Sequence, residues 1–150
     1  MEDERRVNEI MTRQVVTLRE EDNLEGLADS MDKLQYRYLP VVDDTRFVGL
    51  LTYRNLMRPE GRVSRPPNPD DPQGVRWERS SFVADVMARA VPTLPPDALA
   101  GDAARLLMRH GVPCVPILDE DESLVGIVTR DDLLRLTIEL LEGANRAGWS

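Results

Sequence analysis

Apolar and polar positions follow the same order twice along this chain. The repeated apolar positions of the opening stretch are Val7, Ile10, Met11, Val15 and Leu18, matched 76 positions later by Val83, Val86, Met87, Val91 and Leu94. Further along, Gly49, Thr52 and Leu56 recur 77 positions later as Gly126, Thr129 and Leu133. One residue has been added in the polar stretch before the glycine, where a turn tolerates an insertion. The pattern predicts two copies of one structural unit.

The spacing of apolar residues in the first copy predicts the order helix, strand, helix, strand, strand, helix. The expected elements are a short helix Val7–Met11, a strand Val15–Leu18, a helix opened by Asp22, strands Tyr38–Val42 and Phe47–Thr52, and a short helix from Tyr53. Asp22 and Glu25 have the spacing of a capping box. At helical spacing, the expected buried face is Leu24, Leu27, Ala28, Met31 and Leu34.

The second copy repeats this order. Its main helix carries Ala100, Ala103, Ala104 and Leu107 on one face, and strands are expected at Cys114–Leu118 and Leu124–Thr129, before a helix from Arg130. The order predicts an α+β (α/β-like) fold of two tandem units, each a small three-stranded mixed sheet with flanking helices. A unit of about 55 residues has a weak core on its own. We therefore expect the two units to pack with pseudo-two-fold symmetry.

These patterns place a first domain at residues 7–58 and a second at 82–143. The intervening linker, 59–81, holds five of the eleven prolines and several arginines. Such a long proline-rich connection is typical of irregular chain.

Composition narrows the classes of function. With 19 basic and 27 acidic residues the net charge is −8, which disfavours binding to nucleic acid or to an anionic membrane. One cysteine and one histidine make a disulfide, a multi-histidine metal site or a histidine-based triad hard to assemble. No apolar run approaches the roughly 18 residues of a membrane span, and no signal peptide is apparent. We expect a cytoplasmic, non-enzymatic protein without a resident metal or cofactor.

Two motifs carry a resemblance to a known family. Gly49-Leu50-Leu51-Thr52-Tyr53-Arg54-Asn55-Leu56 and Gly126-Ile127-Val128-Thr129-Arg130-Asp131-Asp132-Leu133 each follow a strand with a Pro-Val or Pro-Ile pair and an aspartate. Together with the Val-x-x-Ile/Val-Met openings, they resemble the cystathionine-β-synthase (CBS) domain family, and the tandem resembles a Bateman module in a stand-alone CBS domain-containing protein. The resemblance implies a regulatory, signal-transducing module whose cleft between the copies binds AMP, ADP, ATP or S-adenosylmethionine.

The chemistry of Thr129 and Asp132 agrees with that implication. A carboxylate one turn into a helix can accept hydrogen bonds from both hydroxyls of a ribose, and a hydroxyl with free amides at the helix start can hold a phosphate. The same spacing is also a capping box that serves the helix alone. Asn55 stands where the family usually has aspartate, and its neutral amide grips a diol less well.

By the family pattern, each site combines one such motif with strand residues of the other copy. The stronger predicted site consists of Thr129, Arg130, Asp132, Val16, Tyr36, Arg37 and Tyr38. Arg37 matches a position where some members place an arginine that contacts phosphate. The weaker predicted site consists of Thr52, Asn55, Pro92, Val112, Pro113 and Cys114. Cys114 also fits a plain core position in an apolar strand.

An alternative is a homodimerising interaction module that binds no nucleotide. The last helix carries Leu133, Leu134, Leu136, Ile138, Leu140 and Leu141, a wider apolar surface than one sheet covers, which indicates burial against another chain. A dimer is also compatible with the sensor, whose effector protein is unknown. An enzyme built on paired carboxylates is disfavoured, because the adjacent Asp131 and Asp132 point in different directions on a helix.

Overall fold

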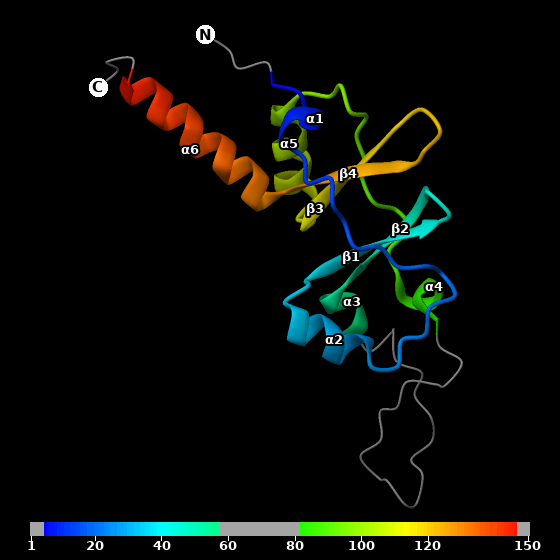
Figure 1. Cartoon of the computed structure of the whole chain (residues 1–150). Helices are drawn as coiled ribbons and strands as arrows, with labels where there is room; N and C mark the ends of the chain where they lie inside the picture. Colours follow the sequence, from blue (N-terminus) through cyan, green and yellow to red (C-terminus); the bar gives the residue numbers. More distant parts are fainter. Residues whose placement is uncertain (1–4, 58–81, 147–150) are drawn as a thin grey trace, which may run out of the picture. The chain divides into compact units, whose positions relative to one another are not determined.

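The computed structural model describes residues 5–57 and 82–146, and these fall into two compact units (Figure 1). Unit 1 combines the chain up to Val15 with the chain from Pro92 onwards, and unit 2 is Val16–Val91. The predicted linker 59–81 lies outside the described residues. The domain boundaries 7–58 and 82–143 stay a prediction about the linear repeats, because the contacts group the chain differently.

Unit 2 is built on one antiparallel hairpin. Its elements are α2 (Leu27–Leu34), β1 (Tyr38–Asp43), β2 (Arg46–Thr52), α3 (Tyr53–Met57) and α4 (Val83–Val86). The strands pair from Tyr38 opposite Thr52 to Asp43 opposite Arg46, with a register shift at Val41/Val42. Asp44 takes a positive φ of 59° in the turn, a conformation that aspartate tolerates better than most residues. The expected hairpin is confirmed.

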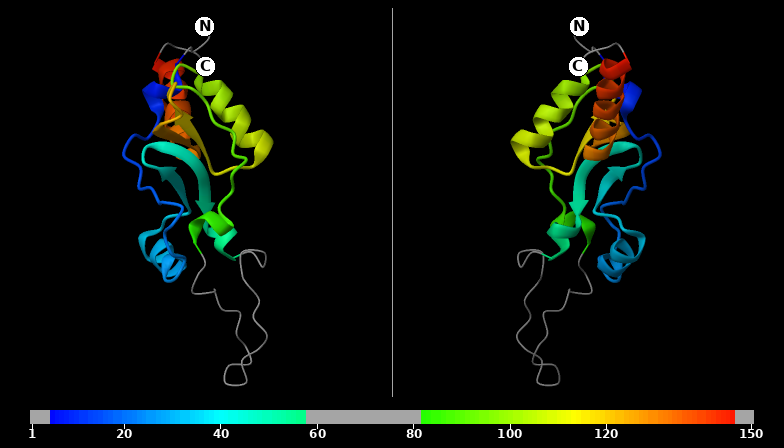
Figure 2. Two further views of the ribbon diagram at one scale, coloured as in Figure 1. Left: turned by 90° about the vertical axis from the view of Figure 1, so that its right-hand side faces the viewer. Right: turned by 90° about the vertical axis from the view of Figure 1, so that its left-hand side faces the viewer.

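Unit 1 repeats this architecture with longer helices. Its elements are α1 (Val7–Ile10), α5 (Ala100–His110), β3 (Cys114–Leu118), β4 (Leu124–Thr129) and α6 (Arg130–Arg146). Cys114 pairs with Thr129 and Leu118 with Leu124. Helix α5 packs on β3, and α6 contacts both β4 and α5 (Figure 2). Helix α5 ends where Gly111 takes a left-handed φ of 62°, which glycine adopts without penalty.

The short helix that opens each repeat packs in the unit built by the other repeat. Val7 is fully buried and Met11 nearly so in the core of unit 1, together with Ile117 and Val128. Val83 and Met87 take the equivalent places in the core of unit 2, with Val41 and Leu51. The start of the chain is therefore part of the unit formed by the second repeat.

The predicted first strand of each copy is reduced to one residue. Leu18 makes an isolated parallel bridge to Val41, and Leu94 makes the same bridge to Ile117, so each sheet has two strands. Val16 and Thr17 of the predicted strand are exposed, so no buried apolar face stabilises a longer strand there. In the second copy prolines surround Leu94, and proline has no N–H to donate to a ladder.

The predicted start of the first-copy helix is also wrong. Helix α2 begins at Leu27, after Gly26 in the left-handed conformation (φ 75°). Asp22 instead accepts a hydrogen bond from the Arg19 N–H at 2.8 Å, in the turn before the helix. Met31 is buried as expected, but Leu34 is 62% exposed in the last turn.

Candidate functional site

The Thr129–Asp132 motif lies where β4 leads into α6 in unit 1. The Thr129 N–H donates to Asp132 Oδ2 at 2.9 Å, and the Asp132 N–H donates to Thr129 Oγ1 at 3.1 Å. These reciprocal bonds satisfy amides that the start of a helix leaves without intrahelical partners. The motif therefore serves as a capping box, and any ligand must bind to a carboxylate that already has this role.

Two further side chains contact the Asp132 carboxylate. Thr12 Oγ1 donates to it from 3.0 Å (Oδ1) and 3.2 Å (Oδ2), and the Arg135 guanidinium lies 3.1 Å from Oδ1. The Asp132 side chain is only 1% exposed, whereas that of Arg135 is 70% exposed. Asp132 is the one charged residue that is buried among those the structure describes. Several donors around a buried carboxylate satisfy its acceptor positions and hold it in one orientation.

Thr12 reaches Asp132 because its backbone is fixed against β4. Its N–H donates to the Ile127 carbonyl at 2.8 Å, and the Ile127 N–H donates back at 2.9 Å. Gly126 allows this approach, since a Cβ there would lie 3.0 Å from the Thr12 carbonyl oxygen and 2.6 Å from the Met11 sulfur. Because Gly126 has no side chain, the backbone of Met11 and Thr12 can pack closely against the edge of β4.

Unit 2 contains a simpler version of the same arrangement. Asn55 Oδ1 accepts from the Thr52 N–H at 3.1 Å and from Thr52 Oγ1 at 2.7 Å, and the Asn55 N–H donates to Thr52 Oγ1 at 3.0 Å. Ala88 occupies the place of Thr12, with matching backbone bonds to Leu50 at 2.9 Å each way. Since residue 88 is alanine, that position offers no hydroxyl to the Asn55 side chain.

The remaining predicted residues divide between the two units. Unit 1 holds Arg130, whose side chain is exposed at the start of α6, and the half-buried Pro92, Val112 and Pro113. Its Cys114 pairs directly with Thr129 across the hairpin. Within unit 1 the structure therefore brings Thr129 next to a residue that the sequence assigned to the weaker site.

Unit 2 holds the predicted partners of the stronger site. Val16, Tyr36 and Arg37 are exposed, and Tyr38 pairs with Thr52. The Arg37 carbonyl accepts a hydrogen bond from the Tyr53 N–H at 2.9 Å, next to the Thr52–Asn55 motif. Within this unit Arg37 is thus close in the fold to the motif with the neutral amide.

Sequence reasoning missed Thr12 and Arg135. The signal for Thr12 was present in the repeat, because the matched openings differ there, with Thr12 in the first copy and Ala88 in the second. Arg135 follows Asp132 by three residues, a spacing at which side chains meet on a helix. Neither residue belongs to the family motif, so the resemblance did not point to them.

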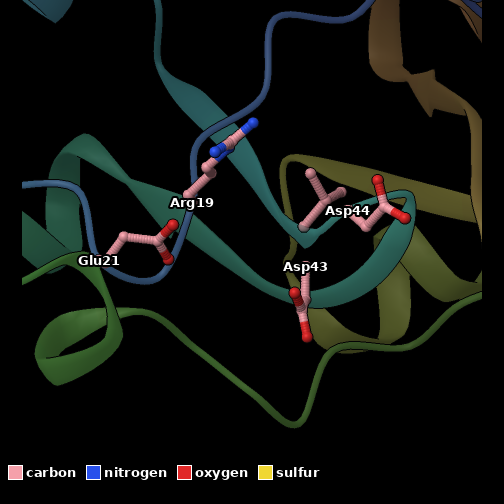
Figure 3. Close-up of a pocket in the computed structure, with 5 residues that line it drawn as sticks. Arg19, Glu21, Asp43 and Asp44 are labelled. Carbon is pink, nitrogen blue, oxygen red and sulfur yellow. The ribbon is translucent and has the colours of Figure 1, made fainter.

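Unit 2 also has a surface hollow, between the segment that precedes α2 and the β1–β2 hairpin. Figure 3 shows the charged residues that line it, which are Arg19 and Glu21 from the segment before α2, Asp43 at the end of β1 and Asp44 in the turn that follows. Three carboxylates against one guanidinium disfavour a phosphate there. Within residues 5–57 and 82–146, no group of three or more histidine, cysteine, aspartate or glutamate side chains is arranged to hold a metal ion.

Cys114 lies inside unit 1, and its environment suppresses its reactivity. Burial raises the pKa of the thiol from 9.0 to about 12, because the thiolate loses its hydration. The neutral thiol thus stabilises the fold below pH 9, and this contribution is lost as pH rises from about 9 towards about 12. We expect N-ethylmaleimide to spare the native protein at pH 8 and to add one adduct after unfolding in guanidinium, as followed by intact mass. Rapid labelling of the folded chain would contradict the buried position.

Comparison with known proteins identifies the family. The CBS domain model matches residues 7–59 and again residues 83–139, so this chain belongs to the CBS domain family and carries two CBS domains in tandem. A CBS domain-containing protein of Dictyostelium discoideum is 30% identical over 139 residues, which cover 91% of this chain and 93% of that one. An uncharacterised protein of Methanocaldococcus jannaschii is 25% identical across 89% of this chain. The chain spans 44% of the length of that second relative.

Solved structures share the fold. CBSX2 in complex with AMP superposes with a TM-score of 0.72 at 20% identity, covering 90% of this chain and 97% of that one. The CBS domain pair of protein MJ0100, in complex with methylthioadenosine and S-adenosylmethionine, gives 0.68 at 21% identity, covering 90% and 97%. The cytosolic domain of the Mg²⁺ channel MgtE in complex with ATP gives 0.66 at 26%, covering 89% and 49%. In the described part of this chain, no helix has the length and apolar character needed to cross a membrane.

Proposed function

We propose that this chain is a regulatory module that binds an adenosyl ligand through the Thr129–Asp132 motif of unit 1. The observation that carries the proposal is the buried Asp132 carboxylate, held by a fixed hydroxyl and amide and capped by one exposed arginine. A ribose offers two neighbouring hydroxyl donors, and a carboxylate accepts both in a bidentate arrangement. The charge makes those bonds stronger than bonds to a neutral amide.

The donor set leaves a route for the ribose to enter. A carboxylate has about four acceptor positions, and Asp132 now receives donors from Thr129, Thr12 and Arg135. Arg135 is the easiest of the three to displace, because its side chain is 70% exposed and can turn into solvent, whereas Thr129 donates through its backbone and Thr12 is fixed by backbone bonds to Ile127. After Arg135 leaves, two ribose hydroxyls complete the set. Binding would then free a cationic side chain, and this change can be passed to an effector protein.

Relatives support the chemical class of the ligand. AMP, ATP, S-adenosylmethionine and methylthioadenosine all contain an adenosyl group, and each is bound in a structure that shares this fold. What these ligands have in common is the ribose diol and the adenine ring, not the charge of the 5′ substituent. The motif around Asp132 is suited to that shared part.

The sequence resemblance extends the proposal to further residues. It assigns Val16, Tyr36, Arg37 and Tyr38 to the site of Asp132, and Pro92, Val112, Pro113 and Cys114 to a weaker site with Thr52 and Asn55. Two double variants test this assignment, Arg37→Ala with Asp132→Asn and Arg37→Ala with Asn55→Ala. The AMP affinity of each is compared with that of its single variants. The effects of residues that share a ligand are not additive, whereas those of separate sites are.

Thermal unfolding with and without ligand tests the function. AMP, ATP or S-adenosylmethionine at about 100 times its dissociation constant should add roughly 2.7 kcal/mol to the free energy of unfolding. The matched control is 2′-deoxy-AMP, which lacks one of the two hydroxyls and should give a much smaller shift. The absence of a shift with every adenosyl compound would refute ligand binding.

A second candidate is an interaction module that pairs with another copy of the chain. Leu134, Ile138 and Leu141 follow one another at helical spacing on α6, and each is more than half exposed. Apolar stripes of this kind are typical of interfaces. The same melting experiment separates the two functions. A melting temperature that rises with protein concentration but not with ligand would favour the interaction module.

A further inference from the structure

The two units differ at one position beside their matching motifs, and this difference has a chemical consequence. Thr12 in unit 1 and Ala88 in unit 2 hold the same backbone position, each bridged in both directions to the second strand of its hairpin. Only Thr12 carries a hydroxyl. It is directed at a carboxylate, whereas Ala88 stands in the unit that has the amide of Asn55.

Thr12 holds the carboxylate in place more firmly than Arg135 can. Its Oγ1 lies at nearly equal distances, 3.0 and 3.2 Å, from the two oxygens of Asp132. A donor placed between both oxygens resists rotation of the carboxylate about its terminal bond. The Thr12 backbone is fixed by two hydrogen bonds to Ile127, so the hydroxyl stays where it is when an exposed arginine moves away.

This role matters most when ligand is bound. If a ribose displaces Arg135, the buried charge loses its cationic partner, and a buried charge is tolerated only with other donors. The Thr129 amide and the Thr12 hydroxyl then remain as the protein's own donors. With two ribose hydroxyls they fill the four acceptor positions of the carboxylate.

The Asn55 side chain has no acceptor position left for a ribose hydroxyl. The single acceptor oxygen of the amide already receives the Thr52 N–H at 3.1 Å and the Thr52 hydroxyl at 2.7 Å. Both of its acceptor positions are therefore in use inside the motif. The other end of the amide is a donor and cannot accept from a diol.

We propose that Thr12 is a positioning residue for ligand recognition at Asp132, and that the Thr12–Asp132 pair directs the ribose diol to unit 1. This inference rests on the proposed adenosyl-binding function. It adds a residue outside the repeated motif. It also explains why the ligand would bind at the motif of unit 1, since unit 2 has Ala88 in place of Thr12 and Asn55 in place of Asp132.

The test compares AMP binding by calorimetry in the full chain and its variants. Thr12→Val, which keeps the shape and removes the hydroxyl, is expected to weaken AMP binding about tenfold or more, as for loss of a hydrogen bond to a charged group. Thr12→Ser should stay within about threefold of the parent. Thr137→Val is the matched control, because that hydroxyl donates to the Leu133 carbonyl on the outer part of α6, and it should leave binding unchanged.

A second readout separates positioning from simple loss of structure. The parent should prefer AMP over 2′-deoxy-AMP, and Thr12→Val should reduce that preference. A purely structural defect would weaken both nucleotides equally and leave their ratio intact. If Thr12→Val keeps the parent's affinity and ratio, the role of Thr12 is refuted. If the parent itself binds no adenosyl compound, the proposed function fails first.

A gain-of-function variant covers the case in which Thr12→Val does not fold. Ala88→Thr combined with Asn55→Asp gives unit 2 the chemistry of unit 1. The expected result is a rise in AMP stoichiometry from one to two per chain, whereas Asn55→Asp alone should give weaker binding at the new site. Identical titrations for the double variant, the single variant and the parent would overturn the proposal.

Discussion

Replacing Asp132 by asparagine is expected to leave the chain folded and to weaken AMP binding roughly 30-fold, equivalent to about 2 kcal/mol. Hydrogen bonds from the ribose would lose the charge of their acceptor, and the amide has one acceptor oxygen in place of two. The fold should survive because unit 2 already uses this residue. Asn55 accepts the Thr52 N–H at 3.1 Å, in the way that Asp132 accepts the Thr129 N–H at 2.9 Å.

Asparagine is a sharper choice than alanine at this position. Asp132→Ala would also remove the capping interaction, whose loss typically destabilises a helix by about 1 kcal/mol, and would leave the Thr12 hydroxyl without its acceptor. Circular dichroism melting checks that Asp132→Asn is folded, and calorimetry with AMP measures the affinity. The control is Asn55→Ala. If that variant loses binding while Asp132→Asn keeps it, the ligand belongs with the motif of unit 2.

The hairpins and the last helix could be predicted from sequence because their signals are local. Both strands of each hairpin, and the start of α6 at Arg130, follow from apolar runs bounded by turn residues. The repeat made these assignments mutually consistent. Met31 and Leu107 are buried, as their spacing indicated.

Features set by distant contacts were not predictable in this way. Nothing in the spacing around Val7 indicates that its helix packs in the unit formed by the second repeat. Likewise, Asp22 and Glu25 have capping-box spacing, but the positive φ of Gly26 delays the start of α2. Local patterns cannot decide between such outcomes, because the deciding interactions join residues far apart in sequence.

At the candidate site, too, the local motif was predictable from sequence and the contact distant in sequence was not. The Thr129–Asp132 motif was visible because its members are three residues apart, a spacing that fits both a capping box and a carboxylate that binds a ligand. The structure adds that Thr12, 120 positions earlier, donates to the same carboxylate. Its position depends on how the opening segment pairs with β4, which no motif records.

Replacing Gly126 by alanine is expected to destabilise unit 1 by about 2 kcal/mol, within the range for forcing extra atoms into a packed site. The new Cβ would lie 2.6 Å from the Met11 sulfur and 3.0 Å from the Thr12 carbonyl oxygen. The methionine end can move, but the carbonyl is held by the Ile127 N–H at 2.9 Å. Relief of the clash must therefore push Thr12 away from the sheet edge and from Asp132.

Gly143→Ala is the matched control, since a Cβ there meets nothing within 4 Å on the exposed end of α6. In a helix that substitution should stabilise by about 0.5–1 kcal/mol. Guanidinium unfolding of the two variants gives the difference directly. If Gly126→Ala is as stable as Gly143→Ala, the opening segment does not press against β4. Because the same displacement carries the Thr12 hydroxyl away from the carboxylate, Gly126→Ala should also weaken AMP binding, whereas Gly143→Ala should not.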